Sequence, residues 1–376
     1  FPASAAVFLP DGHPPCPGDI FRQPDLARSI GEIAQGGPDL FYRGALGRRI
    51  AGALAEVGGV LSADDLAGHA TDVSAPLETT YRGYTVYETA LPTQGFVVLE
   101  ALNIVERAKP DSRALTSAEG VHLGAEALKA AFADRNAYAG DPRLVDVPIA
   151  DLISKGWAAE RFAGIDPNHA SADARAGALS AAHTTSLCCV DGDGLMISLI
   201  FTLSDAFGSG VVAGDTGILL TNRAGHCFSL EDGSPNLFAP GKRPMHTLNC
   251  YLVADPSGTP VLVGGTPGGD YQPQWNLQTL TGLIDGGLDA QAATEQPRWQ
   301  IWPATYPAEI GQPMELQVED RIGEEAITDL EAKGHAVVRL GPWGARGSVQ
   351  TIARDPETGV LAAGSDPRSE GLALGA

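Results

Sequence analysis

The fold is decided by residues 183–202, HTTSLCCVDGDGLMISLIFT. Two apolar runs in this stretch flank the turn Gly192-Asp193-Gly194, a pattern that predicts a β-hairpin. Thr184 stands where the first strand begins, and Thr202 stands where the second ends. Because antiparallel strands place facing residues side by side, we expect the two hydroxyl groups to lie close together.

The amino-acid composition of the chain changes immediately before this hairpin. Residues 170–182 are rich in Ala, Ser, Gly and Asp, and Leu179 is their one large apolar residue. Such a composition predicts a flexible, exposed linker. Helical patterns dominate before the linker and strand patterns after it. We therefore expect two parts, 1–183 and 184–376, that share one α+β body.

Apolar periodicity supplies the other elements. Pro24 suits the first turn of a helix, and the run Thr116-Ser117-Ala118-Glu119 predicts a capping box. The segment YRGYTVY, residues 81–87, predicts one strand. Further strands are expected at 248–254, 261–265, 336–340, 348–354 and 360–363, and further helices around 275–284 and 322–330.

Composition excludes several classes of protein. The formal net charge of −21 over 376 residues repels phosphate backbones, so we expect no nucleic-acid partner. No apolar run reaches transmembrane length, so we expect no membrane-spanning role. The five cysteines show no metal-binding spacing, and we expect five free thiols, which favours a cytoplasmic location. Because the chain begins with Phe1, periplasmic or secreted locations stay open.

Thr184 is a candidate nucleophile. A threonine hydroxyl needs a base, and an N-terminal residue can use its own α-amino group, whose pKa is about 7.7–8.0 in model peptides. That amine exists only if the His183–Thr184 bond is cut. We expect Thr184 to attack the carbonyl of His183, followed by an acyl shift and hydrolysis of the ester.

Acyl transfer also requires donors for a developing oxyanion. Pro267-Gly268-Gly269 lies between an apolar strand and a helix. Backbone amides at Gly268 and Gly269 could serve, because glycine lets a substrate approach the backbone closely. On local pattern alone, the Thr-Thr pair also fits ordinary strand propensity and Pro-Gly-Gly an ordinary turn.

A resemblance gives these features a common meaning. The second half is similar, nearly end to end, to the small subunit of γ-glutamyltransferases. The matching runs are Thr184-Thr185, Thr202-Leu203, Phe207–Gly210, Gly217–Leu220, Asn222, Ala239–Pro244, Pro267–Gly269 and Gly364–Ser369. The first half resembles the later part of the large subunit, at Phe41–Gly44, Tyr81–Tyr84, Asp134-Arg135 and Gly140–Pro142.

The resemblance implies a four-layer αββα sandwich and self-cleavage into two fragments that stay together as a heterodimer, and it leaves a homo-oligomer of such heterodimers open. It implies that Thr184 carries an acyl group, that Thr202 supports it, and that Gly268 and Gly269 donate to the oxyanion. The acyl group would pass to water or to an amine. No metal or organic cofactor is implied.

The substrate pocket departs from the family pattern. Ser204, two residues after Thr202, stands where typical members have Asn, whereas Asn222 matches the family and is also expected in the pocket. Arg223 and His226 replace a Gln and an Asp that contact a glutamyl amino group. His246 and Thr247 replace two serines. The resemblance is therefore closer to the oxamate-amidohydrolase-like and acylase-like branches, and implies a small donor that ends in a carboxylate or oxo acid.

Other interpretations stay open. Arg223, His226 and His246 could be ordinary paired or surface residues. His122 and Glu126 have the i, i+4 spacing of metal sites, but the sequence offers no third ligand, so we expect packing or a surface pair. The whole protein could also be a catalytically retired binding module. Hydrolysis, transfer and carbon–carbon acyl cleavage would all use the same nucleophile.

Overall fold

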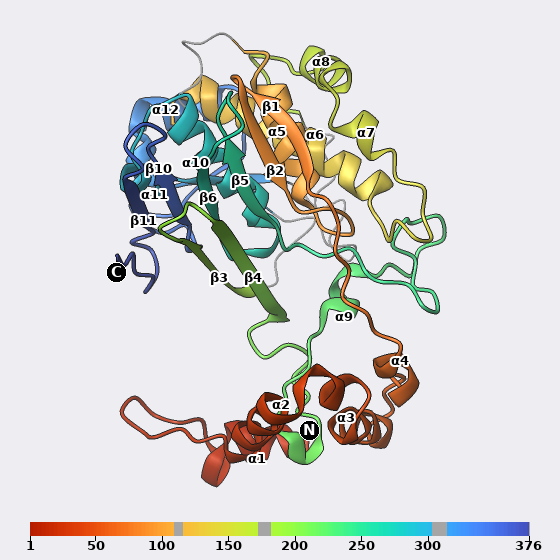
Figure 1. Ribbon diagram of the computed structural model, residues 1–376. Helices are drawn as coiled ribbons and strands as arrows, with labels where there is room; N and C mark the ends of the chain where they lie inside the picture. The colour runs from red at the N-terminus through yellow and green to blue at the C-terminus, as the bar shows by residue number, and fades with distance from the viewer. Residues whose placement is uncertain (109–115, 172–181, 303–313, 376) are drawn as a thin grey trace. The chain divides into compact units, whose positions relative to one another are not determined.

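The computed structural model describes residues 1–108, 116–171, 182–302 and 314–375. They form two compact units, shown in Figure 1. The first unit comprises Phe1–Ser74 and Leu203–Asn222, and the second comprises Ala75–Thr202 and Arg223–Ala376. Most of the expected linker, residues 172–181, lies outside the described residues.

The first unit is helical. Its elements are α1 (Pro2–Phe8), α2 (Pro24–Tyr42), α3 (Ala45–Glu56), α4 (Ala63–Ala67) and the short 3-10 helix η3 (Gly214–Thr216). As expected, α2 begins at Pro24. Leu46 and Ile50 of α3 are buried against Ala213. The hydroxyl of Ser29 donates to the carbonyl of Thr216 at 2.7 Å, which ties α2 to the distant segment 203–222.

The second unit contains a six-stranded antiparallel sheet with the strand order β1-β2-β5-β6-β10-β11. The strands are β1 (Leu77–Tyr81), β2 (Tyr84–Glu88), β5 (Cys250–Ala254), β6 (Pro260–Gly265), β10 (Gln350–Arg354) and β11 (Leu361–Ser365). A three-stranded sheet contains β7 (Trp299–Trp302), β8 (Glu315–Val318) and β9 (Val337–Arg339). The predicted hairpin, β3 (Ala182–Val190) with β4 (Met196–Asp205), forms a separate two-stranded sheet.

One predicted strand is wrong. Residues 81–87 are not continuous, because β1 and β2 form a tight hairpin around Arg82 and Gly83. Both turn residues have positive φ, 53° and 89°, as a two-residue type I′ turn requires. The Arg82-Gly83 pair carries this signal only weakly, because arginine rarely adopts that conformation.

Helices cover one face of the six-stranded sheet. The helices of this layer are α5 (Gly95–Val105), α10 (Gln272–Ile284) and α11 (Ala290–Glu295). Three more helices, α6 (Ala118–Tyr138), α7 (Ile149–Leu152) and α8 (Lys155–Ala163), pack on α5, and α12 (Glu324–Ala332) lies beside the smaller sheet. The expected cap of α6 shifts by one residue, because Ser117 and not Thr116 accepts the backbone N–H of Gly120. The face of α6 that carries Val121, Ala125, Leu128 and Phe132 is buried in the core.

The β3–β4 hairpin packs on the opposite face of the same sheet. A Cβ atom at Gly265 of β6 would face Ser198 of β4, whereas one at Gly364 of β11, which is in line with Gly264, would face Ala290 of α11. Because successive residues of a strand point to opposite faces, the layers follow the order helices, sheet, hairpin. This order places the start of β3 against the sheet (Figure 1).

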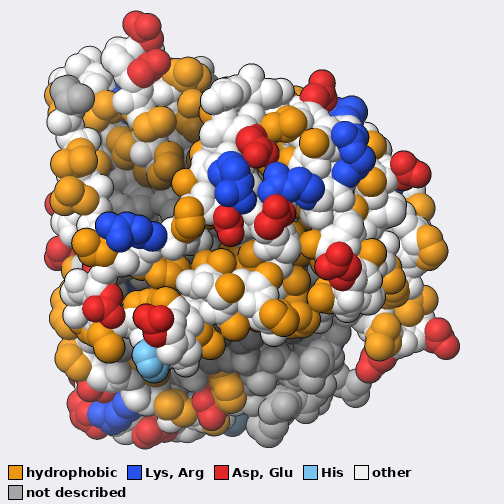
Figure 2. Space-filling view, turned by 90° about the horizontal axis from the view of Figure 1, so that it is seen from below, with side chains coloured by type: hydrophobic (Ala, Val, Ile, Leu, Met, Phe, Trp, Pro, Cys, Tyr) orange, Lys and Arg blue, Asp and Glu red, His pale blue; other side chains and the backbone are white. Residues whose placement is uncertain are grey.

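Basic and acidic side chains are interspersed. On the face seen in Figure 2, the lysine and arginine side chains of the described residues lie among acidic and hydrophobic ones and form no continuous basic surface. Among the same residues, no helix is both long and apolar enough to cross a bilayer. All five cysteines are free thiols, as predicted.

One buried arginine, Arg368, anchors the run Gly364–Ser369 to the rest of the second unit. Arg368 donates to both carboxylate oxygens of Glu319, at 2.6 and 2.7 Å, and to Asp366 at 3.1 Å. The side chains of Arg368 and Glu319 are 1% and 0% exposed. The C-terminal run is therefore anchored to the end of β8 by charge-assisted hydrogen bonds.

We predict that Arg368→Met lowers the free energy of unfolding by about 3 kcal/mol, the lower end for a broken buried pair, because Glu319 keeps Arg321 and Asp366 keeps Arg298 as a remaining partner. Arg339→Met is the matched control, since Arg339 pairs with Glu324 at the surface, with side-chain exposures of 43% and 75%. That variant should change stability by about 0.5 kcal/mol or less. Urea unfolding measures both, and equal effects would contradict the prediction.

Candidate active site

The two threonines of the hairpin lie together, as predicted. The hydroxyl of Thr184 donates to the hydroxyl oxygen of Thr202 at 3.1 Å. Both side chains are partly buried. The contact arises because Thr184 lies near the start of β3 and Thr202 near the end of its partner β4. A hydroxyl held in this way has a fixed direction of attack. The side chain of His183 lies outside the described part of the structure.

Thr184 opens onto a cavity of about 330 Å³. Polar, uncharged side chains line much of it, including Thr185 and Ser186 from β3 and Ser348 from the loop before β10. Pro267 lines the same cavity, so the Pro-Gly-Gly loop begins at the cavity onto which Thr184, the candidate nucleophile, opens. The volume lies at the lower end of the range of small-molecule sites, about 300–1,000 Å³.

The loop conformation requires glycine at both expected oxyanion positions. Gly268 has φ of 139° and Gly269 has φ of 59°. A Cβ atom at Gly268 would lie 2.5 Å from the ring of Trp275. Gly269 opens the 3-10 turn Gly269–Tyr271, which packs against β3 and leads into α10. Two consecutive amides at the start of a helix are suitable donors for a negative oxygen.

Three residues that the site prediction missed hold this loop. Nε2 of Gln94 donates to the carbonyl of Gly269 at 3.0 Å and to the carbonyl of Thr247 at 2.9 Å. Arg135 donates to Oε1 of Gln94 and forms a bidentate pair with Asp270, at 2.6 and 3.0 Å. The resemblance had included Arg135 only as part of a matching run. Gln94 belongs to a segment distant in sequence, and local pattern carries no signal for it.

The predicted pocket residues Arg223, His226, His246 and Thr247 belong to the second unit. Arg223 and His226 lie on the short helix α9 (Arg223–Cys227). Arg223 is 9% exposed. The burial of His246 itself, together with the positive charge of Arg223, lowers the pKa of His246 to about 4. Among the described residues, the buried Nδ1 of His246 has no hydrogen-bond partner. A neutral imidazole therefore lies near a buried guanidinium.

Ser204 and Asn222 belong to the first unit. Ser204 is buried and has positive φ, 79°. Asn222 donates from Nδ2 to Asp205 at 2.6 Å and accepts the backbone N–H of Asp205 at 3.1 Å. These contacts fix the turn that follows β4. The substrate-binding roles of Ser204 and Asn222 stay predictions.

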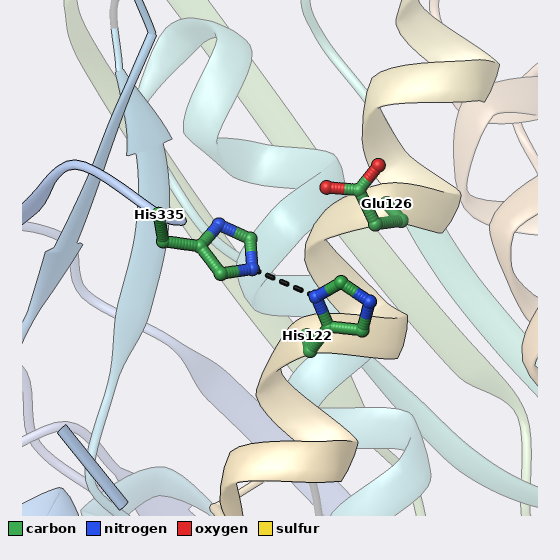
Figure 3. Close-up of side chains that lie close together, drawn as sticks. All are labelled: His122, Glu126 and His335. Carbon is green, nitrogen blue, oxygen red and sulfur yellow. Dashed lines mark hydrogen bonds between the residues drawn. The ribbon is translucent and has the colours of Figure 1, made fainter. Parts of the chain in front are cut away.

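His122 and Glu126 gain a third neighbour that the sequence did not reveal. His335 follows α12, and its Nε2 lies 2.8 Å from Nδ1 of His122 (Figure 3). The ligand atoms of His122, Glu126 and His335 all lie within 4.8 Å of one another, and all three residues are buried. The expected packing of His122 and Glu126 agrees with their burial, but the absence of a third candidate ligand, inferred from the sequence, is wrong.

Hydrogen bonds nevertheless account for this cluster without an ion. Nε2 of His122 lies 2.8 Å from the carbonyl of Asp166, so it carries the proton, and Nδ1 of His122 accepts from His335. The ammonium of Lys129 donates to Glu126 at 2.7 Å. That ammonium already supplies the positive charge which a metal ion would bring.

Comparison with known proteins gives consistent matches. A family model described as Gamma-glutamyltranspeptidase matches residues 1–376. The chain is 36% identical over 374 residues to the glutathione hydrolase-like YwrD proenzyme of Bacillus subtilis, covering 100% of this chain and 70% of that protein. It is 37% identical over 378 residues to the oxamate amidohydrolase proenzyme of Klebsiella pneumoniae, covering 100% and 69%.

A solved structure is similar over nearly the whole chain. The crystal structure of cephalosporin acylase from Bacillus halodurans matches with a TM-score of 0.87 and 35% identity, covering 99% of this chain and 66% of that one. The relatives are thus longer, and this chain spans about two thirds of their length.

The buried histidine pair makes stability depend on pH. Burial, Lys129, His122 and Lys333 lower the pKa of His335 to about 3 from its ordinary 6.5. A lowered histidine pKa means that the unfolded chain binds the proton first, so stability present above pH 6.5 is lost as pH falls towards 3.

We predict that His335→Gln flattens this dependence. At pH 5.5, one unit below the unfolded pKa, this histidine should cost the wild type about 1.4 kcal/mol relative to neutral pH. The amide that replaces the imidazole in the variant does not take up a proton, so it should cause no such loss in the free energy of unfolding. Urea unfolding gives the free energy of unfolding of both proteins at pH 7.5 and 5.5. The difference between wild type and variant should shrink by this amount at the lower pH. Equal losses of stability in the two proteins would refute the lowered pKa of His335.

Proposed function

Because the chain belongs to the gamma-glutamyltranspeptidase family, we propose that it is an N-terminal-nucleophile amide hydrolase or acyltransferase that acts through Thr184. The observation that carries this proposal is the Thr184–Thr202 hydroxyl contact at 3.1 Å, beside a cavity that Thr184 shares with Pro267. Nucleophile, supporting hydroxyl and candidate oxyanion loop are thereby adjacent.

The proposed reaction begins with cleavage of the chain itself. The hydroxyl oxygen of Thr184 attacks the carbonyl carbon of His183, and the bond to nitrogen breaks. Water then hydrolyses the resulting ester, which leaves Thr184 with a free α-amine. In the mature protein this amine takes the hydroxyl proton as the oxygen attacks a substrate amide. The proton passes to the leaving amine, and water or another amine then takes the acyl group from the ester.

Electrostatics near Arg223 suggest the acyl donor. A buried guanidinium favours a carboxylate by charge-assisted hydrogen bonds. His246 is neutral at pH 7 and offers a ring nitrogen without opposing that charge. A donor with a free α-ammonium group would meet Arg223 as a like charge. We therefore propose a small dicarboxylic or oxo-acid monoamide. The name of the oxamate amidohydrolase relative is consistent with such a donor, because oxamate is the monoamide of a dicarboxylic acid.

Self-cleavage is the first test. We predict that the wild-type protein runs as two fragments divided at residue 184 on a denaturing gel, and that Thr184→Ala stays whole. Thr185→Ala is the matched control, since it removes the neighbouring hydroxyl and should still be cut. N-terminal sequencing of the C-terminal fragment must begin at Thr184. An active protein that remains uncut would overturn the proposal.

Donor selectivity is the second test. We predict that kcat/KM for glutaryl-p-nitroanilide exceeds that for γ-glutamyl-p-nitroanilide by at least about tenfold, which corresponds to 1.4 kcal/mol. Arg223→Gln should lower the glutaryl value by about 10–100-fold, the range expected for a lost charge-assisted hydrogen bond. Arg143→Gln, at a partly exposed pair with Asp141, should leave it unchanged. Preference for the γ-glutamyl donor would refute the carboxylate-only assignment.

A further inference from the structure

A buried polar chain joins the candidate oxyanion loop to the candidate pocket wall. It consists of Gln94, Arg135 and Asp270, which we call the loop clamp. Gln94 and Arg135 have 0% and 1% of their surface exposed, and Asp270 has 2%. Gln94 precedes α5, Arg135 lies on α6, and Asp270 directly follows Gly269. Three separate parts of the second unit therefore meet at one point.

The amide of Gln94 holds two backbone carbonyls at once. A glutamine NH₂ group has two protons, and here one is directed to Gly269 and the other to Thr247. Gly269 belongs to the oxyanion loop, and Thr247 follows His246. The distance between loop and pocket wall is thus set by one side chain.

Arg135 fixes the orientation of that amide. It donates to Oε1 of Gln94, so the NH₂ group must face the two carbonyls. The bidentate pair with Asp270 also holds the residue after Gly269. Restraint matters here because glycine otherwise has wide conformational freedom, and both glycines have positive φ.

We propose that Gln94, oriented by Arg135 and Asp270, is a positioning residue that sets the oxyanion amides at their working distance from the acyl pocket. This inference rests on the proposed function. Gln94 touches only backbone carbonyls and Arg135 in the described contacts, so it acts through the loop and not on the substrate itself.

The chain contains a matched control for a purely structural role. Gln278 of α10 is also buried, and its Nε2 also donates to two backbone carbonyls, those of Gln274 at 3.0 Å and Trp299 at 2.8 Å. It joins α10 to β7 and does not contact the Pro-Gly-Gly loop. Replacing either glutamine by Met removes two hydrogen bonds that a buried side-chain amide donates to backbone carbonyls.

The experiment compares Gln94→Met, Gln94→Glu and Gln278→Met in the full-length protein. Glutaryl-p-nitroanilide hydrolysis gives kcat and KM per cleaved molecule, and thermal unfolding gives stability. Gln94→Glu guards against misfolding, because a carboxylate keeps the volume and the contact with Arg135 but has no N–H to donate. Wild type and Thr184→Ala are run alongside.

We expect both Gln94 variants to lose about 100-fold in kcat, with KM changing less than tenfold, as for a misplaced oxyanion donor. Gln278→Met should lower the unfolding temperature similarly to Gln94→Met and keep kcat within threefold. Equal kcat for the Gln94 and Gln278 variants would overturn the positioning role of Gln94 and leave the proposed function standing. A wild type that neither self-cleaves nor hydrolyses the anilide would overturn the proposed function, and the clamp's role with it.

Discussion

The antiparallel contact between the start of β3 and the end of β4 is the constraint on which the rest of the site depends. It brings the hydroxyls of Thr184 and Thr202 to 3.1 Å. Residues at a chain end are poorly ordered unless other contacts tie them down, so the proposed cleavage before Thr184 would require such a restraint. The hairpin holds Thr184 by its backbone, and the six-stranded sheet holds the hairpin from one side.

The Pro-Gly-Gly loop depends on buried polar side chains from other parts of the chain for its conformation. A loop of two glycines with positive φ has little conformational preference of its own. Gln94, Arg135 and Asp270 restrain it from three directions, and Trp275 closes the space beside Gly268. Because these groups are buried, each unmade hydrogen bond would cost more than at the surface. The loop is thereby placed by tertiary structure and not by its own sequence.

That distinction decides what could be predicted from the sequence. The hairpin at 183–202, the adjacency of Thr184 and Thr202, and the last two strands follow from local alternation and turn residues, and the structure confirms them. The N-terminal-nucleophile fold came from the family resemblance, and the 0.87 TM-score to an acylase supports it. Gln94 and His335 were missed because their partners lie far away in sequence, where no periodicity or spacing records the contact.

The charge of the molecule and the proposed charge of the substrate are of the same sign. A net charge of −21 repels an anionic donor, but exposed charges act over only about 8 Å at physiological ionic strength. Arg223 is buried, so its attraction to a carboxylate is screened far less by salt than the surface repulsion is. Affinity for a carboxylated donor must therefore come from contacts inside the pocket and not from long-range steering. A neutral His246 beside Arg223 fits that requirement, because a second positive charge there would raise the desolvation cost that the substrate carboxylate has to offset.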